Sequence, residues 1–168
     1  MRMFEMSGTL VSPNQPAAVV AAAGQASRKA ADLALWSARQ LAAAAFSGDP
    51  VAVERTVRTA HYAYNVELSG RCLPLLVQLV TRHPLPGWRF APPGWRWPTV
   101  HECALLELLG RLQAGENQRA AALLERHRCG HITATVLERA RCYATELTLG
   151  GLTLPAAAHR PHGLRVVK

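Results

Sequence analysis

The stretch PGWRFAPPGWRW, residues 86–97, contains the phrase Pro-Gly-Trp-Arg-aromatic twice, first at 86–90 and again at 93–97. Five prolines and two glycines fall within residues 84–98. Proline lacks a backbone donor and clashes inside a helix, so this segment is predicted to be non-helical. We therefore expect residues 84–97 to form an extended strap that joins two helical halves.

The half before the strap has clear helix signals. Ser12 and Pro13 suit the start of a helix that the Ala-rich sequence continues to Phe46, and Asp49-Pro50 places a cap and a proline at the start of the next. A third, shorter helix is predicted from Pro74 to Arg82. No segment alternates with period two for long enough to be a strand.

The half after the strap begins with Thr99 and Glu102, which have the T-x-x-E spacing of a capping box. Leucines recur at helical spacing behind it, and Gly115 and Gly130 divide the following sequence into further helices. The fold class is therefore all-α, a compact bundle of five or six helices. Its predicted parts are a flexible leader (1–11), a helical domain (12–151, with halves of about 12–83 and 98–151 around the strap 84–97) and a flexible basic tail (152–168).

The two halves also resemble each other. A shift of 67 positions aligns two helical hairpins and places like residues opposite one another, as in the pairs Leu41/Leu108, Ala42/Leu109, Gly48/Gly115 and Val57/Leu124. An internal duplication would explain this match, but two unrelated amphipathic hairpins also align once their turns are superposed. The sequence leaves both explanations open.

The composition favours a helical protein that binds a negatively charged partner. The chain has 168 residues, 49% of them hydrophobic and supplied largely by Ala and Leu, which favour helix. Seventeen Arg and two Lys give a net charge of +8, a balance that attracts phosphate-rich or acidic partners. The excess of Arg over Lys is also what a particular genome base composition would produce.

The four cysteines, Cys72, Cys103, Cys129 and Cys142, are scattered without paired spacing. They are interpreted as small buried apolar residues in a reducing compartment, with no disulfide framework. No apolar run approaches the length of a transmembrane helix, so no membrane is expected as a partner. The predicted location is the cytoplasm.

The strap combines arginines with tryptophans, and residues 68–101 contain no acid. This composition suits either bases stacked on aromatic rings or a packed loop. We expect the tryptophans to be buried anchors between the halves, with the arginines left at the surface. The predicted strap anchors are Trp88, Trp95 and Trp97, and the predicted nucleic-acid or partner contacts are Arg71, Arg82, Arg89, Arg96, Arg139 and Arg141.

Arg139 and Arg141 enter this set because residues 122–148 can be interpreted as a helix-turn-helix with Ile132 to Thr148 as its recognition helix, although an ordinary helical hairpin explains the same residues. Histidine and cysteine gather at His127, Cys129 and His131, but their spacing is atypical of zinc sites. No metal ligand, cofactor site or catalytic residue is therefore assigned, and whether these three residues bind a metal stays open.

These features predict a small, non-enzymatic regulatory or accessory protein that binds nucleic acid through an arginine-rich face. The alternative is an adaptor whose helical hairpins grip a partner protein without nucleic acid. The expected partner is thus nucleic acid or an acidic protein surface, and a homo-oligomer is compatible with either function.

Overall fold

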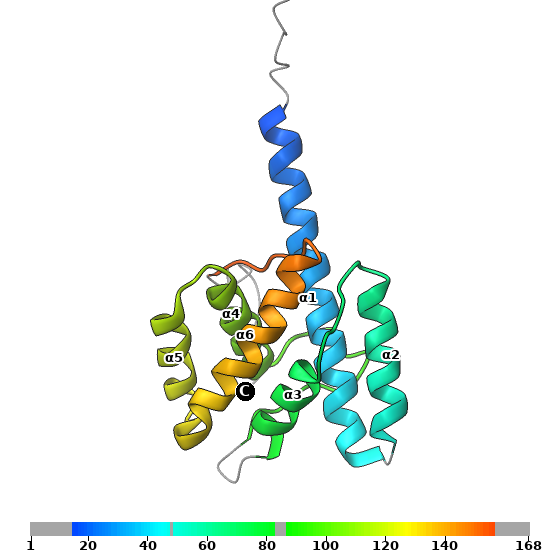
Figure 1. The fold of residues 1–168 in the computed structure, drawn as a ribbon, viewed down its shortest axis with the longest axis vertical. Coiled ribbons are helices and arrows are strands. Elements are labelled where there is room, and N and C mark those ends of the chain that lie inside the picture. Colours follow the sequence, from blue (N-terminus) through cyan, green and yellow to red (C-terminus); the bar gives the residue numbers. More distant parts are fainter. Residues whose placement is uncertain (1–14, 48, 83–86, 157–168) are drawn as a thin grey trace, which may run out of the picture.

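The protein is an all-α bundle, as the sequence predicts. The computed structural model describes residues 15–47, 49–82 and 87–156. Within them lie α1 (Gln15–Ser47), α2 (Pro50–Tyr62), α3 (Cys72–Arg82), α4 (Val100–Gln113), α5 (Asn117–Arg126), the short 3-10 helix η1 (Gly130–Ile132) and α6 (Thr133–Leu149) (Figure 1). The predicted leader, the cap at Ser12, strap residues 84–86 and the tail beyond Ala156 lie outside the described residues.

The first three helices form one unit, in which α1 packs against both α2 and α3. Asp49 caps α2 by accepting a hydrogen bond from the Ala52 backbone N–H at 3.0 Å, and Pro50 occupies the first turn. The N-terminal part of α1 extends beyond the rest of the bundle (Figure 1).

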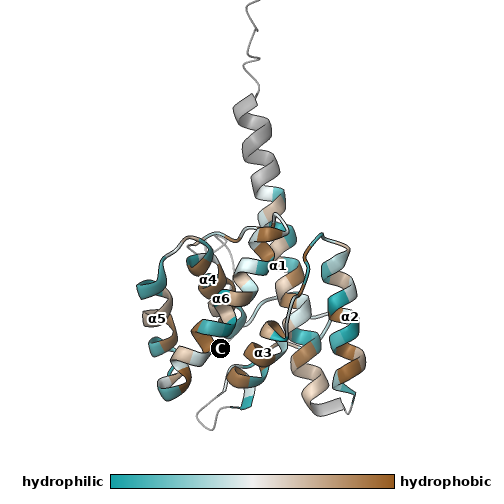
Figure 2. Ribbon diagram, viewed as in Figure 1, coloured by the Kyte–Doolittle hydropathy of each residue, from teal (hydrophilic) through white to brown (hydrophobic). Residues whose placement is uncertain are grey.

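The last three helices form an equivalent unit, in which α4 packs against α5 and α6. The predicted capping box is present: the Glu102 backbone N–H donates to Thr99 Oγ1 at 3.1 Å, and the Thr99 N–H donates to Glu102 Oε2 at 2.7 Å. The units meet where α3 packs on α6 and α1 on α4. Along α5 the ribbon alternates between hydrophilic and hydrophobic residues, because one face is buried (Figure 2).

The burial pattern follows the same shift of 67 positions. Buried residues fall opposite buried residues in all three pairs of helices: Ser37/Ala104, Ala38/Leu105, Leu41/Leu108, Ala42/Leu109, Val57/Leu124, Leu73/Ala140, Leu76/Tyr143, Val77/Ala144 and Val80/Leu147. The match extends to α3 and α6, beyond the hairpins that the sequence aligned. The two halves therefore share one pattern of buried positions along their three helices.

The segment after α6 differs from the predicted flexible tail. Leu152 and Leu154 are buried, and the Gln113 side chain holds both: its Nε2 donates to Leu152 O at 2.9 Å and its Oε1 accepts from the Leu154 N–H at 2.7 Å. Apolar side chains spaced two apart allow an extended segment to pack along α4. Among the described residues, no helix is long and apolar enough to cross a membrane.

Candidate functional site

The first half of the strap is packed into the protein. Trp88 is buried, its backbone N–H donates to Val80 O at the end of α3, and Ala91 is buried as well. The indole lies against two histidines, stacked on His101 at 6.0 Å between ring centroids and edge-on to His127 at 5.5 Å. Trp88 thus packs between α3 of the first half and histidines of the second half, where the sequence predicts an anchor.

The second half of the strap lies at the surface, which makes the anchor prediction wrong for the other two tryptophans. Trp95 is 58% exposed and Trp97 is 52% exposed. The cause is a turn: the Trp95 N–H donates to Pro92 O at 3.1 Å, with Gly94 in the left-handed region at φ +85°. This turn directs the second copy of the repeated phrase away from the core.

The backbone of these two exposed tryptophans is hydrogen-bonded to a buried ion pair. Arg39 of α1 donates through Nε and Nη2 to the two carboxylate oxygens of Glu102, at 2.7 and 2.9 Å. The same guanidinium donates through Nη1 to Trp95 O and through Nη2 to Trp97 O. One buried guanidinium thus holds the backbone at both tryptophans while their side chains are exposed.

Glu102 is fully buried and also accepts a hydrogen bond from the Ala91 N–H at 2.9 Å. Burial alone would raise its pKa, but the bonds from Arg39 and from the Thr99 and Ala91 backbone hold the pKa below its ordinary value. The carboxylate therefore stays charged and connects α1, α4 and the strap. Sequence reasoning found its capping role but missed Arg39, because Arg39 has no motif and its partner is 63 residues away.

Arg96 completes the exposed surface, which we call the strap platform and define as Trp95, Arg96 and Trp97. The Arg96 guanidinium lies 5.1 Å from the centroid of the Trp97 ring. Arg89 is exposed on the same strap, and its backbone is tied to the start of α4 by bonds to His101 and Thr99. The two strap arginines are therefore at the surface, as predicted.

The other four predicted arginines do not join this platform through any described contact. Arg71 forms an ion pair with Glu54, and Arg141 donates to Asn117 Oδ1 at 3.2 Å. Arg139 lies 3.9 Å from Glu138. The helix-turn-helix interpretation is not supported, because α6 packs against both α3 and α4 and is not free to enter a DNA groove.

Arg82 and Arg139 instead line one groove between α3 and α6. The groove has a volume of about 520 Å³, with Leu75, Leu79 and Ile132 as its apolar lining and Gln78, His131 and Thr135 as further polar neighbours. Its chemistry fits an apolar segment that carries negative charge.

His127, Cys129 and His131 do not converge on a common point within the described part of the chain. His127 instead packs edge-on to His101, with ring centroids 5.7 Å apart. Burial lowers the pKa of both rings, and each is lowered further by a nearby positive side chain, Arg89 for His101 and Arg126 for His127. A cluster of neutral rings around Trp88 follows from this.

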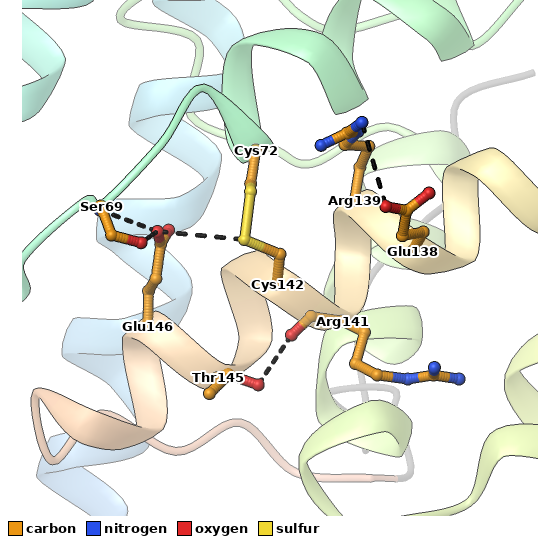
Figure 3. The surroundings of a disulfide bond; sticks show 8 residues. All are labelled: Ser69, Cys72, Glu138, Arg139, Arg141, Cys142, Thr145 and Glu146. Carbon is orange, nitrogen blue, oxygen red and sulfur yellow. Dashed lines mark hydrogen bonds and ion pairs between the residues drawn. A yellow bond between two sulfur atoms is a disulfide. The ribbon is translucent and has the colours of Figure 1, made fainter.

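The prediction that all four cysteines are free is wrong. Cys72 of α3 and Cys142 of α6, which are 70 positions apart in the sequence, form a disulfide (Figure 3). Cys103 and Cys129 are free. The pairing arises because α3 packs on α6, a contact that no local spacing encodes. Glu146 lies one turn further along α6 and is buried beside the disulfide.

Comparison with known proteins gives no match: no protein-family model fits the chain, and no curated protein or solved structure is significantly similar to it.

Proposed function

We propose that this protein is a non-enzymatic cytoplasmic accessory or regulatory protein that binds single-stranded nucleic acid on the strap platform. The observation that carries the proposal is the pair of exposed indoles, Trp95 and Trp97, whose backbone carbonyls both accept hydrogen bonds from buried Arg39. Bases stack on exposed rings without regard to sequence, and a rigid backbone reduces the entropy lost on binding.

Charge supports the same ligand. Arg96 lies over the Trp97 ring and Arg89 is exposed nearby on the strap, so cations stand beside the stacking surfaces. The whole chain carries a net charge of +8, which favours approach of a polyanion. A single strand fits better than a duplex, because stacking needs bases that are free of a partner strand.

The test is fluorescence anisotropy of a labelled single-stranded oligonucleotide at several salt concentrations. Trp95→Ala and Trp97→Ala are each expected to weaken binding by roughly 1–3 kcal/mol, and Arg96→Ala to reduce the salt slope by about one unit. Tyr62→Ala is the matched control, since Tyr62 is an aromatic residue of α2 that is 78% exposed. If Trp95→Ala and Trp97→Ala both bind the oligonucleotide as tightly as the wild type does, the proposal is contradicted.

A second candidate function is the adaptor, which the groove between α3 and α6 favours. Its apolar lining and its two arginines, Arg82 and Arg139, match an acidic amphipathic segment of a partner protein. Salt separates the two functions, because phosphate binding weakens steeply with salt and an apolar contact responds little. Arg82→Ala with Arg139→Ala would then reduce partner binding and leave the oligonucleotide affinity nearly unchanged.

A further inference from the structure

Two cysteines and a carboxylate meet where α3 packs on α6. Cys72 begins α3, while Cys142 and Glu146 are one turn apart on α6. One ligand atom from each of the three residues lies within 4.8 Å of the others, the only such convergence of three or more His, Cys, Asp or Glu side chains among the described residues. Figure 3 shows the Glu146 carboxylate turned toward the disulfide.

Glu146 has half of its hydrogen-bonding capacity unused. The side chain is 5% exposed, and its Oε1 accepts bonds from the Ser69 backbone N–H and from Ser69 Oγ, both at 2.9 Å. Its Oε2 is buried and has no hydrogen-bond partner, and no basic residue of the described chain forms an ion pair with it. A buried carboxylate with an uncompensated oxygen is costly, so this side chain is suited to a cation.

We propose that Cys72, Cys142 and Glu146 form a zinc site when the disulfide is reduced. Two thiolates and a carboxylate are ligands that Zn²⁺ prefers, and three protein ligands with one water complete its tetrahedral shell. Glu146 Oε1 lies 4.0 Å from Cys142 Sγ, and Ser69 holds the carboxylate in place, as hydrogen bonds from outside the shell do in zinc sites.

The backbone geometry permits both states. The Cα atoms of Cys72 and Cys142 are 6.1 Å apart. Zn–S bonds of about 2.3 Å at a tetrahedral angle place two sulfurs about 3.8 Å apart, so the sulfurs must separate only modestly once the bond is broken. Rotation of the two side chains supplies this change and leaves α3 and α6 in contact.

The disulfide and the metal exclude each other. A dithiol reductant gives two electrons and two protons to the S–S bond and is itself oxidised to a disulfide, leaving two thiols. Zn²⁺ binding then releases those two protons as the thiols become thiolate ligands. The site is thus available under reducing conditions and is lost on oxidation, whether or not the protein binds nucleic acid.

The test compares the same chain in its two redox states. Cobalt(II), which takes the same tetrahedral ligands, is titrated anaerobically into reduced and oxidised protein while thiolate-to-cobalt and ligand-field absorption are recorded. The reduced protein is expected to bind one ion with tetrahedral absorption, and the oxidised protein none. Zn²⁺ should displace the cobalt.

Variants identify the ligands. Cys72→Ser and Glu146→Gln are expected to weaken binding at least about tenfold, and Ser69→Ala about tenfold. The Cys103→Ser/Cys129→Ser variant, which removes both free cysteines, should bind as wild type. Equal cobalt binding by oxidised and reduced wild type, or loss of binding only in the Cys103→Ser/Cys129→Ser variant, would overturn the proposal. Circular dichroism of each variant shows whether it is folded, and the wild-type comparison needs no variant.

Discussion

Glu102 shows how one side chain can organise several elements. Its carboxylate caps α4, pairs with Arg39 of α1 and accepts the Ala91 N–H of the strap. Removing one partner of a buried ion pair leaves an unpaired charge and costs about 3–5 kcal/mol, although an apolar replacement of both partners is often tolerated. The pair therefore matters chiefly for the position it gives the strap.

At the same scale, the repeated tryptophans are predicted to respond differently to truncation. Trp88→Ala deletes a buried ring and is expected to cost roughly 3–5 kcal/mol of unfolding free energy. Trp95→Ala removes a side chain that is 58% exposed and should change stability by no more than about 0.5 kcal/mol. Urea unfolding measures both. A large loss of stability in Trp95→Ala would mean that this indole is also packed.

The sequence could predict residues whose role is local, and it could not predict those whose role depends on distant contacts. Thr99 and Glu102 form the predicted capping box because their spacing alone sets that geometry. Two copies of the same phrase, however, placed Trp88 inside and Trp95 outside. The difference comes from what surrounds each copy: Trp88 N–H bonds to α3, whereas Trp95 follows a turn at Gly94.

At the scale of elements, a glycine allows one close contact between α4 and the segment that follows α6. Gly110 lies in the middle of α4, where glycine normally weakens a helix by about 1 kcal/mol relative to alanine. A Cβ at this position would overlap the carbonyl oxygen of Pro155. Glycine here allows the segment after α6 to cross α4 closely, which helps to explain why Leu152 and Leu154 are buried.

Gly110→Ala is therefore expected to destabilise the protein by roughly 1–3 kcal/mol, since the backbone of Pro155 must move. Gly24→Ala is the matched control, because Gly24 is also within a helix, α1, and a Cβ there meets nothing within 4 Å. That substitution should be neutral or stabilise by up to about 1 kcal/mol. Thermal unfolding of the two variants tests this prediction. Equal changes in stability for Gly110→Ala and Gly24→Ala would show that Pro155 does not constrain Gly110.

The helices and their turns were predictable because amphipathic periodicity and helix caps depend on residues that are close together in the sequence, as at Asp49-Pro50. The pairing of α3 with α6 was not predictable from the sequence. Both helices are apolar on the faces they share, and many other apolar helix faces could pack against them equally well. The disulfide and its neighbour Glu146 depend on that pairing. They could be found only once the fold had brought residues 70 positions apart together.

At the scale of the whole molecule, the two three-helix units are joined by an ion pair, a disulfide and a hydrogen bond between side chains. Arg39 binds Glu102 between α1 and α4, and Cys72 is bonded to Cys142 between α3 and α6. His61 of α2 has its Nδ1 2.8 Å from Val57 O and its Nε2 2.9 Å from the Tyr143 hydroxyl oxygen of α6. A carbonyl only accepts, so Nδ1 carries the proton, and because burial lowers the pKa of His61 and favours the neutral ring, Nε2 accepts from the Tyr143 hydroxyl.

Three histidines therefore make the stability of the molecule depend on pH. Burial is the largest cause that lowers the pKa of His61, His101 and His127 below the ordinary value of 6.5, and His127 is a further cause at His101. His101 also accepts the Arg89 N–H at its Nδ1, and Glu107 opposes the shift at His127 without reversing it. In the unfolded chain these rings bind protons at higher pH than in the folded protein, so stability rises with pH through this range.

We expect this contribution to stability to be present above about pH 6.5 and to be lost as the pH falls below it, because the unfolded chain takes up protons that the folded protein excludes. The melting temperature should thus be lower at about pH 5.5 than at about pH 7.5. The double variant His101→Asn/His127→Phe keeps an acceptor for the Arg89 N–H and a ring against Trp88, but titrates at neither position. It should lose part of this pH dependence, with the remainder due to His61. A wild-type melting temperature that is unchanged or higher at the lower pH would contradict the assignment of these rings as neutral.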